Sequence, residues 1–374
     1  MLPYGRQHVD ATDVEAVVAA LGSDWLTTGP RVARFEAELE AVAGAPCVTV
    51  TNGTVALHAA YAAARIGTDD EVITTPMTFV ATASAAAMLG ATVVFADVEE
   101  DTGNIDPVAV EAAVTSRTRA VTAVDYAGHP AEYDALRKVA DRAEATLLAD
   151  AAHAIGSTYR GRPVGSLADL TTFSFFPTKN MTTAEGGAVA ATDPALVERL
   201  RTFRTVGLVR DRAKMRYPEE GGWHQEVHEF GLNYRLPDVL CALGSTQLAR
   251  LDMFKQRRAH LTARYDELLA DVPGLRLPPR RAWVDPLRHL YPVRIRDGRR
   301  REVYDRMRAA GIGVQVNYMP VYWHPAFEDL GYRRGMCPVA EDFYAEQLSL
   351  PLFVDLSEAD QDRVIETLRT VLGG

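Results

Sequence analysis

The sequence predicts an α/β protein built on a mostly parallel sheet with helices on both faces. From about Val32 onward, amphipathic helical stretches alternate with short β-branched runs, a rhythm typical of parallel strands joined by crossover helices. Two runs, residues 145–149 and 171–176, are uncharged and largely apolar, as expected of central strands covered on both sides. With 374 residues, 47% of them hydrophobic, the chain is long enough for one large domain and a smaller one.

The expected elements follow the chain in order. We expect strands at residues 47–50, 72–75, 92–96, 120–124, 145–149 and 171–176, with helices at 55–64 and 78–89 among them. Residues 236–269 carry apolar side chains at helical spacing with no proline after Pro237, which predicts one long helix or two in succession.

The character of the chain changes after Pro273. A smaller α+β unit is expected there, with strands at 291–295 and 314–316 and helices at 300–309, 339–348 and 357–372. The domain boundary falls near residues 251–273, so we divide the chain into a large domain, 1–250, and a small C-terminal domain, 251–374.

Composition argues against several partners. The net charge is −10, with Lys and Arg scattered through the chain, so neither nucleic acid nor a membrane surface is expected to bind. The alanine-rich stretches near 59–64 and 81–88 are too short to span a bilayer, and residues 1–4 lack a signal peptide's basic start and apolar run. The expected location is cytoplasmic. Cys47, Cys241 and Cys337 are widely spaced, which predicts buried small apolar residues and no metal site.

Lys179 is the most informative side chain. Most lysines are solvated, but this one follows the run at 171–176, which contains Ser174, and precedes the glycine pair at 186–187. A lysine held there can form a Schiff base. Asp150 ends the run at 145–149; it could cap a turn, but its uncharged flanks predict a partly buried carboxylate that needs a cationic partner. An acid followed by a lysine suits pyridoxal phosphate (PLP), because the carboxylate keeps the pyridine nitrogen protonated and the amine holds the aldehyde.

Three further features are consistent with this chemistry, and each also has an ordinary structural explanation. The Asn-Gly-Thr turn at 52–54 leads into a helix N-terminus that suits a phosphate, although an ordinary helix cap has the same pattern. Phe79 is either a core residue or a ring stacked on the cofactor. His153 is either a satisfied core histidine or a contact with the cofactor's phenolic oxygen.

Together these residues resemble a known family, the DegT-type sugar aminotransferases, which are PLP enzymes of the aspartate aminotransferase fold. The match covers nearly the whole chain, and its motifs are YGRQ (4–7), LTTGP (26–30), NGTVALH (52–58), PMTFVAT (76–82), DAAHA (150–154), FSFFPTK (173–179) and GLNYRL (231–236). Residues 315–322 and 340–351 are most similar to the branch that aminates a UDP-4-keto-6-deoxy sugar on the way to pseudaminic acid. The resemblance implies a fold-type I PLP-dependent transferase, with a mostly parallel seven-stranded sheet between helices and a smaller α+β C-terminal domain.

The resemblance also implies a role for each matched position. Lys179 and Asp150 match the catalytic pair, Phe79 the stacking aromatic, and His153 a contact with the cofactor's ring oxygen. The matched phosphate positions are Gly53, Thr54, Val55 and Ser174, and the matched substrate positions are Tyr4, Arg6, Thr28, Asn317 and Tyr318. Asn233 matches an asparagine that reaches the phosphate of the neighbouring subunit's cofactor, which implies a homodimer with shared active sites.

The implied reaction moves an amino group from L-glutamate to a keto sugar nucleotide, at C4 of a UDP- or dTDP-4-keto-6-deoxyhexose. Two positions depart from the family's pattern. Ala184 stands where relatives carry glycine, which is acceptable if that backbone is not at positive φ. Asn317 stands where the pseudaminic branch tends to have histidine, which leaves open another keto sugar or an aminocyclitol ketone of antibiotic synthesis.

Two other functions are weighed against this one. A PLP-dependent sugar dehydratase of the same fold has histidine in place of the lysine, whereas this chain has Lys179. A non-catalytic PLP-binding regulator or scaffold finds no support in a basic patch or a DNA-binding segment.

Overall fold

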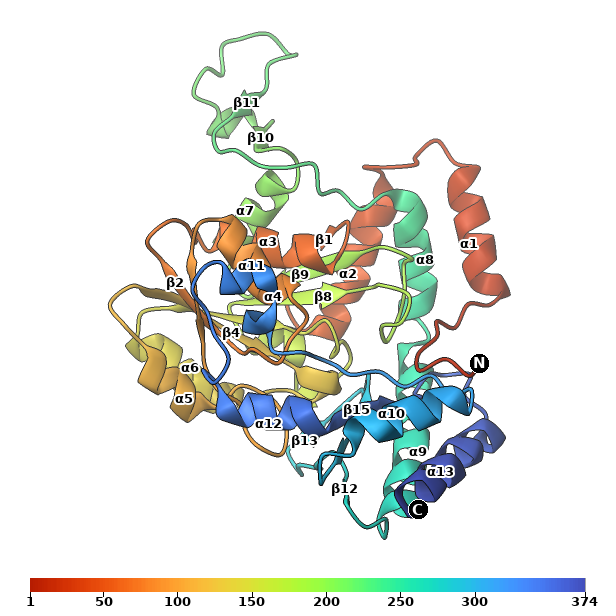
Figure 1. Ribbon diagram of the computed structural model, residues 1–374. Helices are drawn as coiled ribbons and strands as arrows, with labels where there is room; N and C mark the ends of the chain where they lie inside the picture. The colour runs from red at the N-terminus through yellow and green to blue at the C-terminus, as the bar shows by residue number, and fades with distance from the viewer. Residues whose placement is uncertain (374) are drawn as a thin grey trace.

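A seven-stranded sheet forms the centre of the protein, in a computed structural model that describes residues 1–373 (Figure 1). In spatial order its strands are β1 (Cys47–Val50), β9 (Gly187–Ala191), β8 (Leu170–Ser174), β5 (Thr146–Asp150), β4 (Thr118–Val124), β2 (Glu71–Thr74) and β3 (Thr92–Phe95). Only β9 runs antiparallel to its neighbours; every other pair of adjacent strands is parallel. The predicted mostly parallel seven-stranded sheet is therefore confirmed.

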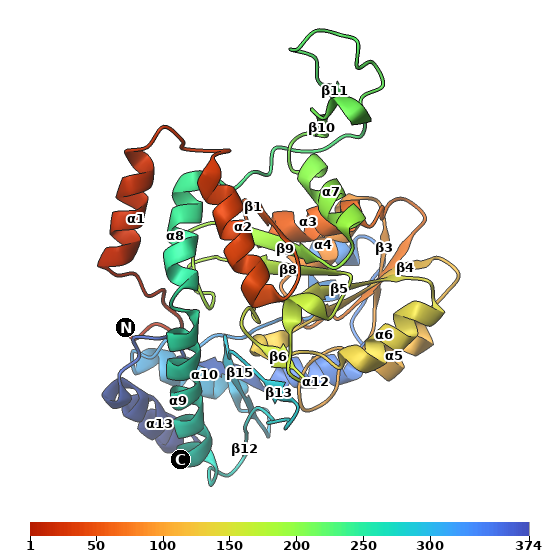
Figure 2. The same ribbon diagram turned by 180° about the vertical axis from the view of Figure 1, so that it is seen from behind.

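Two layers of helices cover the sheet. One face packs on α2 (Pro30–Ala43), α5 (Pro107–Ala113), α6 (Tyr133–Arg142) and α8 (Asp238–Leu248), and the other on α3 (Gly53–Ala63), α4 (Ala81–Met88) and α7 (Pro194–Phe203) (Figures 1 and 2). Successive residues of β5 alternate between the two cores, with Leu147 and Ala149 on one side and Leu148 on the other. The central strands are apolar because both of their faces are buried.

The C-terminal part of the chain has its own hydrophobic core. There α9 (Leu251–Leu269), α10 (Arg300–Ala309) and α13 (Glu358–Gly373) pack with an antiparallel sheet of β12 (Leu275–Arg276), β14 (Tyr291–Ile295) and β15 (Gln347–Leu350). Leu2 packs against this core too and forms a β-bridge with Ile312, so the N-terminus lies beside the C-terminal part. The division of the chain at residue 251 stays a prediction.

An arm projects from the body of the molecule between α7 and α8 (Figure 1). It carries the two-stranded ribbon of β10 (Leu208–Val209) and β11 (Glu226–Val227). The remaining elements are α1 (Ala11–Leu21), the small sheet of β6 (Thr158–Tyr159), β7 (Arg162–Pro163) and β13 (Val284–Asp285), α11 (Pro325–Glu328), α12 (Pro338–Glu346) and the short helices η1 (Tyr126–Gly128), η2 (Val164–Ser166), η3 (Arg212–Lys214) and η4 (Val321–Trp323).

Three predicted elements differ from the structure. The helix expected at 78–89 begins only at Ala81. The turn before it is closed by hydrogen bonds between residues three apart, from Thr82 N–H to Phe79 O (3.2 Å) and from Ala83 N–H to Val80 O (3.2 Å). The helix expected at 339–348 ends at Glu346, since the next residues pair with β14 instead. Tertiary pairing here overrides local propensity.

The strand expected at 314–316 is reduced to a single bridge between Gln315 and Ser349. Its pairing stops because the N–H of Asn317 donates to the side-chain Oε1 of Gln347 (2.8 Å) and not to a backbone carbonyl. Residues 236–269 form two successive helices, α8 and α9, which is one of the two predicted alternatives.

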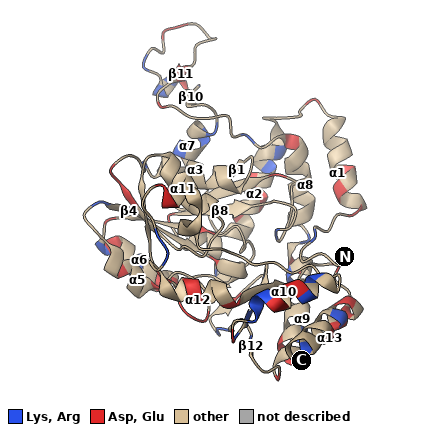
Figure 3. Ribbon diagram, viewed as in Figure 1, with Lys and Arg blue, Asp and Glu red and all other residues tan. Residues whose placement is uncertain are grey.

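The charge and cysteine predictions can also be compared with the fold. Lys and Arg are interspersed with Asp and Glu along the ribbon (Figure 3). All three cysteines are free and buried, as predicted. No helix formed by residues 1–373 is long and apolar enough to cross a membrane.

Candidate active site

Three strand ends bring the predicted site residues to one edge of the sheet. Asp150 is the last residue of β5 and Ser174 the last of β8, and the turn at Asn52 follows β1. β5 pairs directly with β8 in parallel, and β1 runs the same way because β9 lies antiparallel between β1 and β8. The carboxyl ends of these strands therefore meet where open α/β sheets bind their ligands.

Asp150 is held in place by neighbouring donors. The side chain is 5% exposed, and its Oδ2 accepts a hydrogen bond from the Thr82 hydroxyl (2.6 Å). Its Oδ1 accepts from the N–H of Ala152 (3.1 Å). Burial raises the pKa of this carboxyl, while the two hydrogen bonds and the charge of Lys179 lower it. A buried carboxylate with so few partners is a strong site for a ligand cation.

Lys179 lies in the turn that follows β8. Its N–H donates to Phe176 O (2.9 Å), and the neighbouring Asn180 ties the turn down by donating to His153 O (2.8 Å). Burial lowers the pKa of the Lys179 amine to about 8, and the charge of Asp150 acts in the opposite direction. A substantial fraction of this amine is therefore neutral near physiological pH, as a nucleophile must be.

The depressed pKa of Lys179 gives a pH prediction. In the cofactor-free protein, trace acylation of Lys179, followed by mass spectrometry with the exposed Lys138 as internal reference, is expected to reach half its maximum near pH 8. In Asp150→Asn the midpoint is expected at lower pH, because a carboxylate that favours the ammonium form is gone. A midpoint near the ordinary lysine value of about 10.4 in the unmodified protein would contradict the burial argument.

An anion cradle lies between β8 and the start of α3. Asn52 caps the helix by accepting from Val55 N–H through Oδ1 (2.9 Å), which leaves the N–H groups of Gly53 and Thr54 without an intrahelical partner. A Cβ on Gly53 would lie 2.8 Å from the Cβ of Ser174, so only glycine allows this approach. Backbone donors, a hydroxyl and the helix dipole suit a phosphate. Val55 is also predicted as a phosphate ligand, but its N–H already donates to Asn52 Oδ1.

His153 is neutral and has a defined tautomer. Burial is the main cause that lowers its pKa well below the ordinary value. Its Nδ1 accepts from the N–H of Ala127 (3.3 Å), so the proton is on Nε2, which donates to Tyr318 Oη (3.1 Å). The ring of Phe79, 57% exposed, meets Tyr318 edge-on at 6.2 Å between centroids. The three side chains form a polar and aromatic wall beside Lys179.

The other predicted residues lie at different distances from this centre. Tyr4 contacts Thr178 through its side chain, and exposed Arg6 lines a small recess with Lys179. Asn317 is 6% exposed, and its Oδ1 is buried without a hydrogen-bond partner. Thr28 is exposed in the turn before α2, where its hydroxyl donates only to Thr27 O (2.7 Å).

Asn233 lies apart from the catalytic pair in its own chain. It is exposed at the base of the arm, where it forms a β-bridge with Thr205. Among residues 1–373, no hydrogen bond links its side chain to Asp150, Lys179 or Ser174.

Sequence reasoning missed two residues of the site. Thr82 orients Asp150, and the only indication was its place at the end of the motif at 76–82. His289 packs on His153 with 4.4 Å between ring centroids, and its N–H donates to Ala127 O (3.0 Å). None of the motifs found in the sequence contains His289, which lies in the loop just before β14.

The condition set for Ala184 is not met. Its φ is 65°, in the left-handed region that favours glycine, so the expectation of a freely accepted alanine is wrong. The strained turn is held by Ala184 N–H, which donates to the Thr182 hydroxyl (2.9 Å). The left-handed conformation costs about 1 kcal/mol for a residue with a Cβ.

The chemistry of these groups fits one cofactor. An amine with a depressed pKa, a buried carboxylate and a phosphate cradle match the aldehyde, the pyridine nitrogen and the phosphate of PLP. The fold and the site define a PLP-dependent aminotransferase of fold type I.

The chain belongs to the DegT/DnrJ/EryC1/StrS aminotransferase family, which it matches over residues 7–369. It is 39% identical to the spore coat polysaccharide biosynthesis protein SpsC of Bacillus subtilis over 385 residues, covering all of this chain and 97% of that protein. It is 37% identical to a UDP-4-amino-4,6-dideoxy-N-acetyl-β-L-altrosamine transaminase of Campylobacter jejuni over 380 residues, covering 100% and 98%. The PLP form of Spr1654 from Streptococcus pneumoniae superposes with a TM-score of 0.93 at 29% identity, covering 100% and 98%.

Proposed function

We propose that this aminotransferase moves the amino group of L-glutamate to C4 of a UDP- or dTDP-linked 4-keto-6-deoxyhexose. The observation that carries the proposal is the pair formed by Asp150, buried at the end of β5, and Lys179, whose amine has a lowered pKa. PLP bound between them acts as an electron sink. The substrate class follows the resemblance of residues 315–322 and the relative of Campylobacter jejuni, whose name specifies UDP and an amino group at C4 of a 4,6-dideoxy sugar.

Each site residue has a distinct task in this proposal. Asp150 keeps the pyridine nitrogen protonated, and Thr82 orients Asp150. Lys179 holds the cofactor between turnovers and then moves a proton between the substrate carbon and the cofactor's C4′. Phe79 covers the ring, and His153 donates to the ring oxygen in place of Tyr318.

The sugar's own contacts are assigned to the C-terminal part and the N-terminal segment. Asn317 Oδ1 is an acceptor without a partner, and a sugar hydroxyl satisfies it. Tyr318 lies next to Asn317 in the sequence. The side chain of Tyr4 forms a hydrogen bond with that of Thr178, the residue before Lys179. Arg6, beside the recess of Lys179, offers charge to the diphosphate, whereas Thr28 needs a partner subunit to approach a site.

The substrate is tested with a panel of ketones. We expect purified enzyme with glutamate to aminate a nucleotide-linked 4-keto-6-deoxyhexose, seen as the mass of the amino sugar. Turnover of a free cyclitol ketone, coupled with none of any nucleotide sugar, would replace this substrate with the second candidate, which the Asn317 departure favours. Bleaching of the cofactor's absorbance by glutamate separates a working transaminase from a non-catalytic binder.

The enzyme is proposed to work as a homodimer. The arm exposes several large apolar or aromatic side chains, and the most exposed are Phe230 (95%), Trp223 (83%), Tyr217 (53%) and Val227 (51%). Helix α1 also exposes an apolar stripe of Val14, Val18 and Leu21. Exposed apolar surface on this scale marks a protein interface. Asn233 at the base of the arm then reaches the cofactor phosphate of the partner subunit.

A complementation experiment tests the shared site. Mixed dimers of Lys179→Ala and Asn233→Ala subunits carry one site with both native residues if the asparagine acts across the interface. We expect about a quarter of the wild-type activity after random exchange of equal amounts, because half of the dimers are mixed and each has one intact site. Activity no higher than that of the Asn233→Ala parent, in mixtures shown to exchange subunits, would mean that each site is built from one chain.

A further inference from the structure

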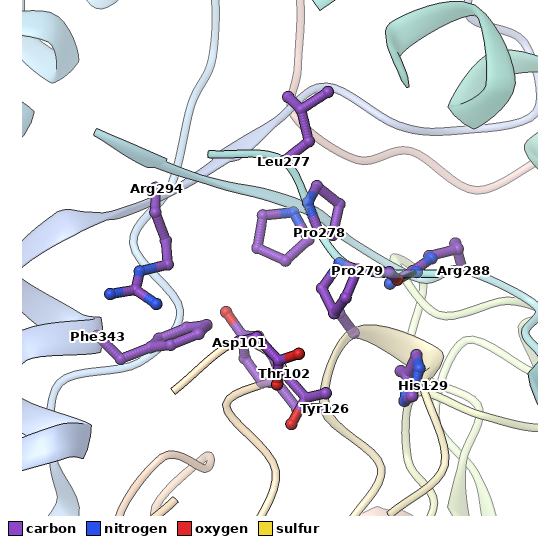
Figure 4. Close-up of a pocket in the computed structure, with 12 residues that line it drawn as sticks. Asp101, Thr102, Tyr126, His129, Leu277, Pro278, Pro279, Arg288, Arg294 and Phe343 are labelled. Atoms are coloured by element: carbon purple, nitrogen blue, oxygen red, sulfur yellow. Dashed lines mark hydrogen bonds between the residues drawn. The ribbon is translucent and has the colours of Figure 1, made fainter. Parts of the chain in front are cut away.

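Residues 287–289, just before β14, are buried beside the catalytic centre. Leu287 is 0% exposed, Arg288 8% and His289 6%. The side chain of Arg288 lies beside Pro279 (Figure 4), to whose carbonyl its Nη2 donates (2.6 Å). This segment belongs to the C-terminal part of the chain, whereas the catalytic pair follows strands of the central sheet. Contacts between the two therefore connect both parts of the molecule at the active site.

Asn180, the residue after Lys179, makes such a contact. It is 3% exposed, and its Nδ2 donates to His153 O (2.8 Å), in the turn after β5, and to Leu287 O (3.1 Å). Because both partners are carbonyl oxygens, which only accept, the amide nitrogen must face them. One side chain thus ties together the turn of Lys179, the turn after β5 and the C-terminal segment.

Two neighbouring residues show how closely these carbonyls are packed. Gly128 has a φ of 88°, and a Cβ there would lie 2.3 Å from Leu287 O and 2.9 Å from His153 O, so only glycine fits. The Oγ of Ser157 accepts from Leu287 N–H (2.7 Å) and donates to Gly128 O (3.0 Å). Both backbone groups of Leu287 are therefore bonded to side chains of the central part, one to Ser157 and the other to Asn180.

The amide oxygen of Asn180 is buried and has no hydrogen-bond partner. An unpaired buried acceptor costs free energy, and an apolar side chain would avoid that cost. What an asparagine contributes at this position is therefore its two donated hydrogen bonds. They bear directly on the neighbouring Lys179, whose own N–H donates to Phe176 O (2.9 Å).

The C-terminal segment also carries part of the wall around the lysine. The Nη1 of Arg258, in α9, donates to the carbonyls of Arg288 and His289 (3.3 Å each). Arg258 lines a small recess together with Lys179. A displacement of residues 287–289 would therefore change how much water reaches the lysine.

We propose that Asn180 is a positioning residue, which holds the turn of Lys179 against Leu287 and so keeps water away from the catalytic amine. The inference rests on the proposed role of Lys179. Burial is the larger of the two causes that set the pKa of this amine, about 8, and the charge of Asp150 acts in the opposite direction. Loosening the turn weakens both, so the net change is expected to be upward.

The test is trace acylation of Lys179 in the cofactor-free full chain, where the amine is free to react, with Lys138 as reference. Asn180→Ala is expected to raise the midpoint by about one pH unit or more, from near pH 8 toward the ordinary lysine value of about 10.4. Asn180→Ser keeps one donor and is expected to have an intermediate midpoint; it replaces the alanine variant if that one does not fold.

Gln361→Ala is the matched control for a loss of stability alone. Gln361 is also a buried amide that donates to a backbone carbonyl, Leu261 O (2.8 Å), and has an unpaired oxygen, but it lies in α13. Its midpoint is expected to stay near pH 8 even where its melting temperature falls as far as that of Asn180→Ala.

A double variant tests the link to the C-terminal segment. Ser157→Ala leaves Leu287 N–H without its acceptor and is expected to raise the midpoint by less than Asn180→Ala does. If both side chains hold Leu287, the double variant shifts the midpoint by less than the sum of the single shifts. Additive shifts, or none in Ser157→Ala, would overturn the link to Leu287, and a midpoint near pH 8 in the Asn180 variant would overturn the proposal as a whole. Neither result bears on whether Lys179 is catalytic, which turnover of Lys179→Ala decides.

Discussion

Lys179→Ala is expected to remove the visible absorbance band of the covalently bound cofactor and to lower turnover by more than about 10⁴-fold. The variant loses the amine that holds the aldehyde and the group that moves the proton. No other lysine can replace it, since the remaining three, Lys138, Lys214 and Lys255, are at other places on the chain and two of them form ion pairs. The measurement is the absorbance spectrum together with the rate of amino sugar formation.

Two controls make the Lys179 result specific. Lys255→Ala removes another partly buried lysine, which donates to Asp285 (2.7 Å) and Gly156 O (2.9 Å), and is expected to keep the band and the rate. Added small amines are expected to restore part of the proton transfer in Lys179→Ala, because the cradle and Asp150 are intact. A Lys179→Ala enzyme that keeps the band and still transaminates would refute the assignment.

The central sheet and the catalytic pair could be predicted because their evidence is local. Strands β5 and β8 are buried on both faces and lie in uncharged, largely apolar runs, so their ends, Asp150 and Ser174, were found from the sequence. The glycine turn before α3 is local as well, and its closeness to Ser174 follows from parallel strand order.

Other features depend on contacts between distant segments and left no pattern in the sequence. Gln347 was expected in a helix, but its backbone pairs with β14 and its side chain accepts from Asn317 N–H, which also ends the strand predicted at 314–316. His289 lies against His153 only because two loops meet at Ala127. The positive φ of Ala184 is likewise set by the turn around it.

Asp150→Asn is expected to keep bound cofactor and to lower turnover by a factor on the order of 10² to 10³, the loss caused by removing one partner of a buried ion pair. An amide of the same shape still accepts from Thr82 or Ala152, so the fold is expected to survive. It cannot neutralise a protonated pyridine nitrogen, and the ring then withdraws electrons less strongly. Thr82→Val is the graded comparison, because it keeps the carboxylate and removes only the 2.6 Å hydrogen bond to Oδ2, and its loss is expected to be smaller. If Asp150→Asn matched the wild type in rate and in the pH dependence of its cofactor spectrum, Asp150 would be a turn-capping residue and the cofactor's pyridine nitrogen would need another partner.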